Sequence, residues 1–368
     1  MHTLNKELAA ERYAAEWIDA ADWYRTHAIE AYHNPDFVLQ HLDHPVVSQK
    51  LNAEFNTSTV ERTRMFEALS YGDPSFLLTT PGPSLSGVLL EVLGNQWQQD
   101  MFVEHVQQQT ARTFFAVTEP EKGSDAGNLL TTLSDGTALN GRKLLVGNGA
   151  LGSIGTVLFK SGQKMLGLGA VMLPPDALKQ SNVHRQVLDM YALRGAQLSY
   201  LEFKNLTIED EFILGAHLNP IERGMMGLLK TFHKFRPAVS SMAIGHAQAL
   251  LDYFKINPDQ SNDSLQLRLK ARQSEVDAAR EINRRSAHQA DKDPLKGGLV
   301  SHAKQLATVS LEYIVNDIFE LIDSSVLLES VWLQKSLTDA FGYEYMEGTS
   351  HIHFKNIYNA YKRKEILH

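Results

Sequence analysis

Hydrophobic and polar residues follow two different periods along this chain, and the changes of period divide it into three zones. Up to about residue 113, apolar residues recur at helical spacing with charged residues between them, which predicts amphipathic helices. From 114 to 216 the apolar runs become short and rich in β-branched and aromatic residues, which predicts strands. Long helical patterns return from 217 to 368. We therefore expect an α+β protein with an N-terminal all-α domain (1–113), a central β domain (114–216) and a C-terminal helical bundle (217–368).

Gly, Pro, Asn and Asp residues give the approximate bounds of the expected elements. Helices are expected over 5–32, 44–55, 91–111, 222–254, 264–290 and 297–337, the last with one break. Strands are expected over 113–120, 136–148, 156–162, 166–174 and 198–208. The stretch TTPGPSLSG (79–87) reads as a loop because of its Pro and Gly residues.

Composition excludes some classes of protein without choosing one. The 368 residues carry a formal net charge of -8, and 43% of them are hydrophobic, as in ordinary globular proteins. The absence of cysteine excludes disulfides, thiolate metal ligands and cysteine nucleophiles. The mild acidity argues against nucleic acid as a partner, and no apolar run is long enough to span a bilayer. Because the N-terminal residues lack the apolar core of a signal peptide, we expect a soluble cytoplasmic enzyme.

The first candidate site is the loop AVTEPEKGSDAGNL, which follows a predicted strand. Gly123 can adopt a positive φ angle, and Ser124 and Asp125 expose hydroxyl, carboxylate and N–H groups. Such a loop can hold a polar or phosphate-bearing cofactor. An ordinary Glu-Pro turn has the same composition, and the residues alone favour that simpler interpretation. The P-loop pattern does not occur in the chain.

The second candidate is Glu347, in the stretch GYEYMEGTSHIH. It lies between the apolar Met346 and Gly348, ahead of Thr349 and Ser350, either of which can cap the first turn of a following helix. A carboxylate packed against apolar surface has a raised pKa and can act as a general base, and Gly348 would let a substrate approach the backbone. Glu347 can also simply complement the positive end of the helix dipole. The residues alone favour this second role.

His351 and His353 are the remaining chemical candidates. Two residues apart on a helix, their side chains point to roughly opposite faces, and no nearby acid completes a known metal-ligand spacing. We therefore expect no metal site, and imidazoles that face solvent or a cofactor.

Several stretches, in this order along the chain, resemble motifs of the acyl-CoA dehydrogenase family. FFAVTEPEKGSD resembles the flavin-loop signature of that family, and LNGRKLLVGN resembles its β-domain segment N-G-x-K-x-W-I-T-N. LRGAQLSYLEFKNLTIEDEFILG resembles the strand and exit loop that follow. FHKFRPAVSSMAIGHAQALL and TDAFGYEYMEGTSHIHFKNIYNAY resemble two parts of its C-terminal bundle. The resemblance covers essentially the whole chain. It implies an N-terminal helical domain, a central β-barrel-like domain and a C-terminal four-helix bundle.

The resemblance also implies a cofactor and a reaction. Enzymes of this family bind FAD and oxidise an acyl thioester to the 2,3-enoyl form, while a base removes the α-proton and a hydride leaves the β-carbon for the flavin. By resemblance Glu347 is that base, which reverses the preference drawn from its neighbours alone. The family polarises the thioester carbonyl with the N–H of the base residue and a flavin hydroxyl. Some branches instead place the glutamate beside the arginine of the R-P helix. Here that position is Phe235, ahead of Arg236, so Glu347 has no rival.

Individual contacts follow from the same resemblance. The positions that match cofactor contacts are Phe115, Val117, Thr118, Gly123, Ser124, Thr349 and His351. The positions that match the substrate side are Ser124, Arg236, Met346 and Gly348. Arg236 is either a structural residue or part of an ion pair on that side, and the family usually has Gln at the position of His351.

Three departures from the family pattern change the expectation. Leu145 and Gly147 stand where the family usually has Trp and Thr against the flavin, so a wider pocket is expected near the ring. The family's R-x-x-F-G segment, which reaches the FAD of a neighbouring subunit, has no match. The stretch that contains Asp323 replaces residues that meet the partner's FAD, and its charge is unfavourable near a pyrophosphate. A homodimer or homotetramer is expected from the family, but these changes weaken the case for a tetramer and for tightly held FAD.

Three functions remain open at this point. The first is an FAD-dependent dehydrogenase of an acyl-CoA thioester. The second is a dehydrogenase of a hydroxy- or amino-acyl unit on an acyl carrier protein in polyketide or nonribosomal peptide biosynthesis, which the altered flavin wall and a shortened bundle favour. The third is a flavin-free scaffold relative, favoured by the lost inter-subunit motifs and opposed by the retained Glu347. For the two dehydrogenases the electron acceptor would be a flavoprotein or oxygen.

Overall fold

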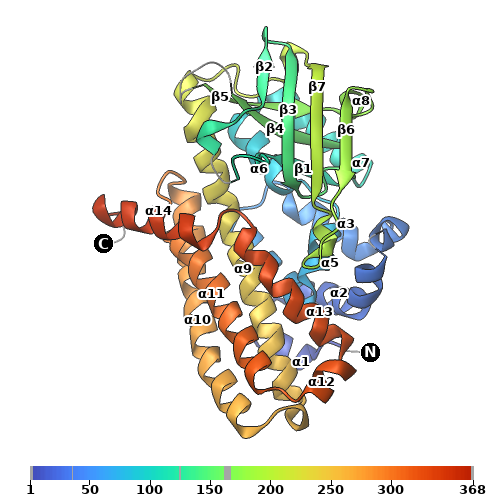
Figure 1. The fold of residues 1–368 in the computed structure, drawn as a ribbon, viewed down its shortest axis with the longest axis vertical. Helices are drawn as coiled ribbons and strands as arrows, with labels where there is room; N and C mark the ends of the chain where they lie inside the picture. The colour runs from blue at the N-terminus through green and yellow to red at the C-terminus, as the bar shows by residue number, and fades with distance from the viewer. Residues whose placement is uncertain (1–2, 35, 124–125, 161–166, 366–368) are drawn as a thin grey trace.

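The structure, a computed structural model, describes residues 3–34, 36–123, 126–160 and 167–365. Helices come first along the chain, a sheet with one short helix follows, and helices return at the end (Figure 1). The sheet lies at one end of the molecule, and the long C-terminal helices run away from it beside the N-terminal helices. This is the order of elements that the hydrophobic periods predict. The domain boundaries themselves stay a prediction.

The described residues of the N-terminal region form seven α-helices. They are α1 (Lys6–Ala10), α2 (Ala15–His33), α3 (Pro45–Glu54), α4 (Thr59–Gly72), α5 (Pro74–Thr79), α6 (Ser84–Leu93) and α7 (Gln96–Gln108), with a short turn η1 (Phe37–His41). Capping residues determine where several of these helices begin. Ser58 and Glu61 form a capping box ahead of α4, and Asn95 and Gln98 form another ahead of α7. Asp73 caps α5 through a bond from the N–H of its third residue.

Within the described residues, seven strands form one sheet in the order β1-β4-β2-β3-β7-β6, with β5 also paired to β4. They are β1 (Thr113–Ala116), β2 (Thr132–Ser134), β3 (Ala138–Val146), β4 (Ile154–Lys160), β5 (Leu168–Leu173), β6 (Val183–Val187) and β7 (Ser199–Thr207), with α8 (Pro175–Leu178) between β5 and β6. β1 and β2 run parallel to β4, and the other pairs are antiparallel. Among the described residues no pairing joins β6 to β5 or to β1.

The C-terminal region begins at a kinked turn, η5 (Glu222–Met226). Its helices are α9 (Gly227–Ile256), α10 (Asp263–Lys292), α11 (Gly298–Leu321), α12 (Ser324–Glu329), α13 (Val331–Ala340) and α14 (Ser350–Lys362). The turn η7 (Phe341–Tyr345) precedes α14. α9, α10 and α11 pack along one another, whereas α14 projects from the side of this bundle (Figure 1).

The sequence interpretation missed two strands and several breaks. β2 and β6 are largely polar and only partly buried, so they carry no hydrophobic alternation and exist through pairing with β3 and β7. The helix expected over 297–337 is broken twice, because Asp323 caps α12 and Ser330 caps α13. The helix expected over 5–32 is divided into α1 and α2. Part of the loop expected over 79–87 is the first turn of α6.

One hydrophobic core joins the N-terminal and C-terminal helices. Its buried residues come mainly from α2, α4, α9, α11 and α13. α4 lies directly against α9, where a Cβ at Gly245 would lie 2.2 Å from the carbonyl oxygen of Glu67, so this contact requires glycine. A second cluster joins α6 and α7 to β4 and β5 and reaches Leu228 at the start of α9. α9 therefore contacts both the bundle and the sheet, and any site between them lies along this helix.

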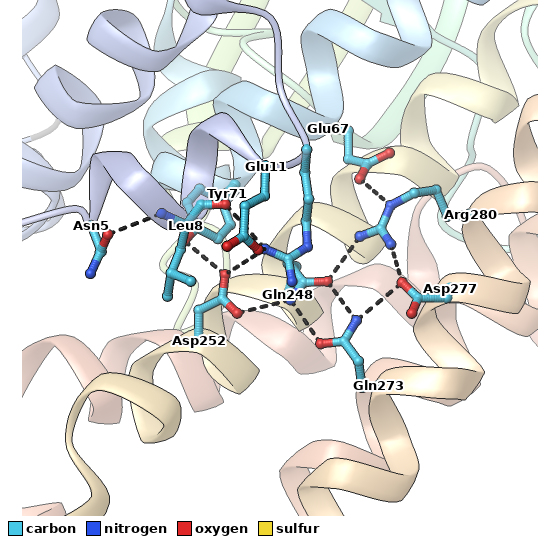
Figure 2. A network of polar contacts seen from close by, with 11 residues as sticks. Asn5, Leu8, Glu11, Glu67, Tyr71, Gln248, Asp252, Gln273, Asp277 and Arg280 are labelled. Carbon is cyan, nitrogen blue, oxygen red and sulfur yellow. Dashed lines mark hydrogen bonds and ion pairs between the residues drawn. The ribbon is translucent and has the colours of Figure 1, made fainter.

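A buried polar network fixes α9 against its neighbours (Figure 2). Gln248 of α9 donates to Asp252 at 3.0 Å and exchanges hydrogen bonds of 2.9 and 3.0 Å with Gln273 of α10. Arg280 of α10 donates to Glu67 of α4 at 2.7 Å and to Gln248 at 3.0 Å. Because each amide and charge in this network has a partner, the bonds offset part of the cost of burial, and the network sets the relative position of three helices.

No helix in the described part of the chain has the length and apolar composition needed to cross a bilayer. The described residues also contain no group of three or more His, Asp or Glu side chains placed to hold a metal ion.

Candidate active site

Glu347 lies in the short connection between η7 and α14. Its backbone is left-handed, with a φ of 56°, and Gly348 follows with a φ of 104°. A non-glycine residue in this conformation costs about 1–2 kcal/mol, so the surroundings must hold it there. Gly348 also has little free space, because a Cβ would lie 3.3 Å from Nε2 of His353. The connection therefore has a specific shape rather than that of a free loop.

Two buried cations bond to carbonyl groups of this connection and of the turn η7 that precedes it. Arg236 of α9 donates from Nε to the carbonyl oxygen of Glu347 at 3.0 Å. Lys304 of α11 donates from Nζ to the carbonyl oxygen of Tyr343 at 2.9 Å and to the hydroxyl of Thr308 at 3.0 Å. Only 7% of Arg236 and 0% of Lys304 is exposed. Hydrogen bonds from ionised donors are the stronger class, so the connection is fixed to both helices.

The carboxylate of Glu347 has no such partner. Its Oε2 is buried and makes no hydrogen bond within the described residues, although the residue as a whole is partly exposed. Burial raises the pKa of Glu347, and the charges of Arg236 and Lys304 oppose that rise. A buried, unpaired carboxylate with a raised pKa suits a general base that awaits a substrate proton. A capping acid would instead be bonded to the helix N–H groups.

Glu344 takes the capping role instead. Its Oε1 accepts from the N–H of Ser350 at 2.8 Å, and its Oε2 accepts from the Ser350 hydroxyl at 2.6 Å. The prediction that Thr349 or Ser350 caps α14 is wrong, because Thr349 occupies the cap position but its side chain accepts no capping bond. The N–H groups of Glu347, Gly348 and Thr349 donate to no acceptor within the described residues. The connection therefore has three backbone N–H groups that remain available to a ligand.

A series of side-chain contacts joins Arg236, which bonds this connection, to β1 of the sheet. The guanidinium of Arg236 lies 4.8 Å from the ring centre of Phe232, which meets Phe115 of β1 edge-on at 5.8 Å. Phe115 is half-buried, whereas Phe114 and Ala116 on the opposite side of β1 are buried in the sheet. These contacts favour the structural alternative for Arg236, and its predicted contact with substrate stays a prediction.

A buried ion pair anchors the loop after β1. Oε1 of Glu119 lies 2.9 Å from Nζ of Lys143 on β3, and both side chains are buried. Glu119 also accepts from the N–H groups of Leu130 at 2.6 Å and Thr131 at 3.0 Å, while Lys143 donates to the carbonyl oxygen of Val117 at 3.0 Å. The sequence interpretation missed this pair, since a Glu-Pro turn on its own does not show which cation meets it.

The predicted cofactor residues of this loop lie on its accessible side. Val117 and Thr118 are partly exposed, and the Thr118 hydroxyl has no hydrogen-bond partner among the described residues. Gly123 is exposed with a φ of 54°, and nothing lies within 4 Å of a Cβ built there. Ser124 lies outside the described residues, so both of its predicted contacts stay predictions.

Leu145 and Gly147 lie where β3 and β7 lose their register, close to that loop. Leu145 has a φ of 56° and is 42% exposed, and the N–H of Leu144 donates to the carbonyl oxygen of Thr118 at 2.9 Å. A Cβ at Gly147 would meet only the carbonyl oxygen of Ala196, at 3.7 Å. This surface therefore has unfilled space, and the wider flavin pocket stays a prediction.

His351 and His353 face opposite sides of α14, as their spacing predicts. His351 is exposed, whereas His353 is fully buried next to Gly348. Neither ring nitrogen of His353 has a hydrogen-bond partner within the described residues. Burial, together with the charges of Arg236 and Lys304, lowers the pKa of His353 to about 3, so its ring is neutral. The predicted cofactor contact of His351 stays a prediction, and the sequence interpretation missed the buried position of His353 beside the connection.

Met346 and Asp323 both have structural contacts. Met346 is partly buried against the main core, and its predicted substrate contact stays a prediction. Asp323 caps α12 by accepting from the N–H and hydroxyl of Ser325 at 2.8 and 2.7 Å, which lowers the pKa of Asp323. The acid at this position is therefore explained by a helix start.

The fold and the family matches place this chain among the oxidoreductases. Two family models match the chain: "Acyl-CoA dehydrogenase, middle domain" over residues 114–206 and "Acyl-CoA dehydrogenase, C-terminal domain" over residues 222–362. Together they span more than half of the chain, which belongs to the acyl-CoA dehydrogenase family.

Individual relatives agree with this assignment. The chain is 24% identical to a 3-(aryl)acrylate reductase of Clostridium sporogenes (strain ATCC 15579) over 293 residues, which cover 76% of each chain. It is 25% identical to the probable acyl-CoA dehydrogenase YngJ of Bacillus subtilis (strain 168) over 284 residues, which cover 73% of each chain.

Solved structures show the same fold at low identity. Butyryl-CoA dehydrogenase from Megasphaera elsdenii superposes with a TM-score of 0.80 at 18% identity, covering 98% of this chain and 99% of that one. The FAD complex of PigA superposes with a TM-score of 0.80 at 17% identity, covering 99% of both chains. The prolyl acyl carrier protein oxidase AnaB superposes with a TM-score of 0.79 at 17% identity, covering 94% of this chain and 99% of that one.

The predicted family, fold class and oxidoreductase activity are confirmed by these comparisons. FAD, the cofactor of the family, fits the residues that are present. Phe115, Val117 and Thr118 offer an apolar face and a free hydroxyl on one side, and the connection with Thr349 offers free donors on the other. The contacts of individual residues with FAD stay predictions.

Proposed function

We propose that this protein is an FAD-dependent dehydrogenase of an acyl thioester and that Glu347 removes the α-proton of the substrate. The observation that carries the proposal is the buried Oε2 of Glu347, which has no hydrogen-bond partner among the described residues, beside a backbone held by Arg236 and Lys304. Burying a carboxylate oxygen without a hydrogen bond is costly, and a ligand that supplies the missing proton offsets that cost. A CoA thioester is the first candidate substrate.

Bound FAD would supply the acceptor for the hydride that leaves the β-carbon. The raised pKa of Glu347 makes its carboxylate a stronger base than an exposed glutamate. The free N–H groups of Glu347, Gly348 and Thr349 can donate to the thioester carbonyl, whose oxygen gains negative charge as the α-proton leaves. The neutral ring of His353 adds no positive charge of its own to this site.

Replacing Glu347 by Gln tests this assignment. Glu347→Gln keeps the shape of the side chain, so we expect an intact fold and bound FAD, with flavin reduction slowed by roughly 100- to 10,000-fold. The assay is anaerobic bleaching of the flavin absorption with a panel of CoA and carrier-protein thioesters. Glu329→Gln, at an exposed carboxylate on α12, is the control and should react like the wild type. A rate for Glu347→Gln within about tenfold of wild type would refute the assignment.

A carrier protein as the donor of the acyl group is the second candidate. An acyl carrier protein is acidic and helical, so it needs a basic surface close to the site. α14 starts three residues after Glu347, and the stretch 350–364 has no acidic residue although the whole chain has a net charge of -8. The basic residues of this stretch are Lys355, Lys362, Arg363 and Lys364.

Reversing these charges tests whether the acyl group is delivered by CoA or by an acyl carrier protein. We expect Lys355→Glu combined with Lys362→Glu to raise KM for a carrier-protein thioester by about tenfold or more. The same acyl group on N-acetylcysteamine carries no charge and should react unchanged. An equal effect on both substrates, or on neither, would argue against a carrier protein docked on α14.

The absorption spectrum of the purified protein tests the scaffold alternative. Flavin bands at nearly one FAD per chain would exclude a flavin-free scaffold, whereas a colourless protein that does not take up added FAD would exclude both dehydrogenases. The electron acceptor and the oligomeric state stay predictions.

A further inference from the structure

A cavity of about 510 Å³ lies between α3, α4, α6, α7, α9 and α10, and none of the described residues predicted for the active site lines it. Part of its wall is apolar, with Val88, Leu90, Phe102 and Val103. Lys234 of α9 also lines the cavity, and it lies two residues before Arg236, so the two side chains leave the helix on roughly opposite faces. The cavity therefore lies on roughly the opposite side of α9 from Arg236, and its volume suits a small organic ligand.

Arg62 of α4 lines this cavity, and its charge has no partner among the described residues. It is 5% exposed, its Nε makes no hydrogen bond, and it forms no ion pair within the described residues. The ring of Phe235 lies 6.0 Å from its guanidinium. Thr59, three residues earlier on the same face of α4, is 1% exposed, and its hydroxyl also has no partner among the described residues. A buried cation and a buried hydroxyl without partners are costly unless a ligand bonds to them.

The three carboxylates that line the cavity are already engaged elsewhere. The contacts are Glu54 with Lys50 at 2.6 Å, Glu91 with Lys234, and Asp291 with the N–H groups of Thr59 at 2.8 Å and Val60 at 3.2 Å. Burial lowers the pKa of Arg62, and these three negative charges at longer range oppose that shift. They would repel a doubly charged anion such as a phosphate more strongly than a single carboxylate.

We propose that this cavity binds a carboxylate on an apolar chain, recognised by Arg62 and Thr59. A guanidinium offers two parallel N–H donors to a carboxylate, the threonine hydroxyl adds a third donor, and the apolar wall covers the chain. The carboxylate belongs either to a small free acid or to the far end of the acyl group whose thioester lies at Glu347. The recognition does not depend on the proposed dehydrogenation, because its residues lie outside that site.

Isothermal titration of the purified protein with hexanoate and with the neutral hexanamide tests the proposal. We expect hexanoate to bind, and both the change to hexanamide and the substitution Arg62→Met to weaken binding by on the order of 10- to 100-fold. Arg64→Met is the matched control, because Arg64 is exposed on another face of the same helix. No binding of hexanoate, or equal binding by Arg62→Met and the wild type, would overturn the proposal.

Stability without ligand gives a second measurement. Arg62→Met removes an unpaired buried charge, so its thermal midpoint should match or exceed that of the wild type. Hexanoate should raise the midpoint of the wild type and of Arg64→Met but not that of Arg62→Met. A midpoint of Arg62→Met well below that of Arg64→Met would contradict the claim that Arg62 lacks a partner. Arg62→Lys keeps the charge and should retain part of the affinity for hexanoate.

Two thioesters identify the source of the carboxylate. In the Glu347→Gln background, adipyl-CoA and hexanoyl-CoA differ only in their terminal group. If the acyl group supplies the carboxylate, adipyl-CoA binds more tightly, and the additional change Arg62→Met removes the difference. If a free acid supplies it, hexanoate binds equally well with and without saturating hexanoyl-CoA. Failure of every thioester to reduce the flavin would refute the proposed function and leave these binding tests intact.

Discussion

The hydrogen bond from Arg236 to the backbone of Glu347 gives the sharpest test of how the site is held. Arg236→Met keeps most of the side-chain volume but removes the donor that lies 3.0 Å from the Glu347 carbonyl oxygen. A bond from a charged donor contributes about 1.5–3 kcal/mol, and it holds a residue whose left-handed backbone is itself unfavourable. If that energy serves to position the carboxylate, flavin reduction slows by about 10- to 100-fold.

The same substitution also changes the pKa of the base. Burial raises the pKa of Glu347, and the positive charge of Arg236 holds that rise in check. Removing the charge therefore raises the pKa further. Glu347 must be ionised to take a proton, so the reaction is lost as the pH falls through this pKa. We expect the acidic limb of the pH–rate profile to lie at higher pH in Arg236→Met than in the wild type.

Stopped-flow flavin reduction over a range of pH separates the two effects. Arg236→Lys is the control that keeps the charge but not the planar guanidinium with its Nε donor. Its maximal rate should fall, while its acidic limb stays close to that of the wild type. An acidic limb that is unmoved or lies at lower pH in Arg236→Met would refute the electrostatic argument. A wild-type maximal rate in both variants would refute the positioning argument.

Two further changes test the scaffold around the site. Nζ of the buried Lys335 lies 2.5 Å from a carboxylate oxygen of Asp73 and 2.7 Å from one of Asp339. Lys335→Met therefore leaves two buried carboxylates without their cation. This substitution should lower the free energy of unfolding, measured in denaturant, by about 3–5 kcal/mol. The control Lys179→Met, at an exposed ion pair, should lower it by less than about 1 kcal/mol. Equal losses in the two variants would contradict the reasoning. Gly348→Ala places a Cβ in a conformation with a φ of 104° close to a buried histidine ring, so flavin reduction should fall by tenfold or more while the thermal midpoint changes little. A wild-type rate in that variant would show that the shape of the connection does not matter.

Much of the architecture could be predicted from local patterns. The change from helical to strand period and back is visible in windows of a dozen residues, and the capping box at Ser58 and the Asp-Pro start of α5 are equally local. Glu347 could be singled out because its neighbours in the chain are unusual, and its resemblance to a family motif supplied the role. The polar strands β2 and β6 were missed, because they depend on pairing with β3 and β7 rather than on their own residues.

The sequence by itself determined most of the helices and strands, though not the polar strands β2 and β6, and it identified one glutamate and one loop as candidates for chemistry. Only the tertiary structure decided what those residues meet. Arg236, Lys304 and Glu347 come from three separate segments, and the unpaired Arg62 faces a cavity whose walls come from six helices. The physical reason is range: helix period, caps and turns act over a few residues, whereas burial, ion pairing and the shift of a pKa depend on which distant segments the folded chain brings together.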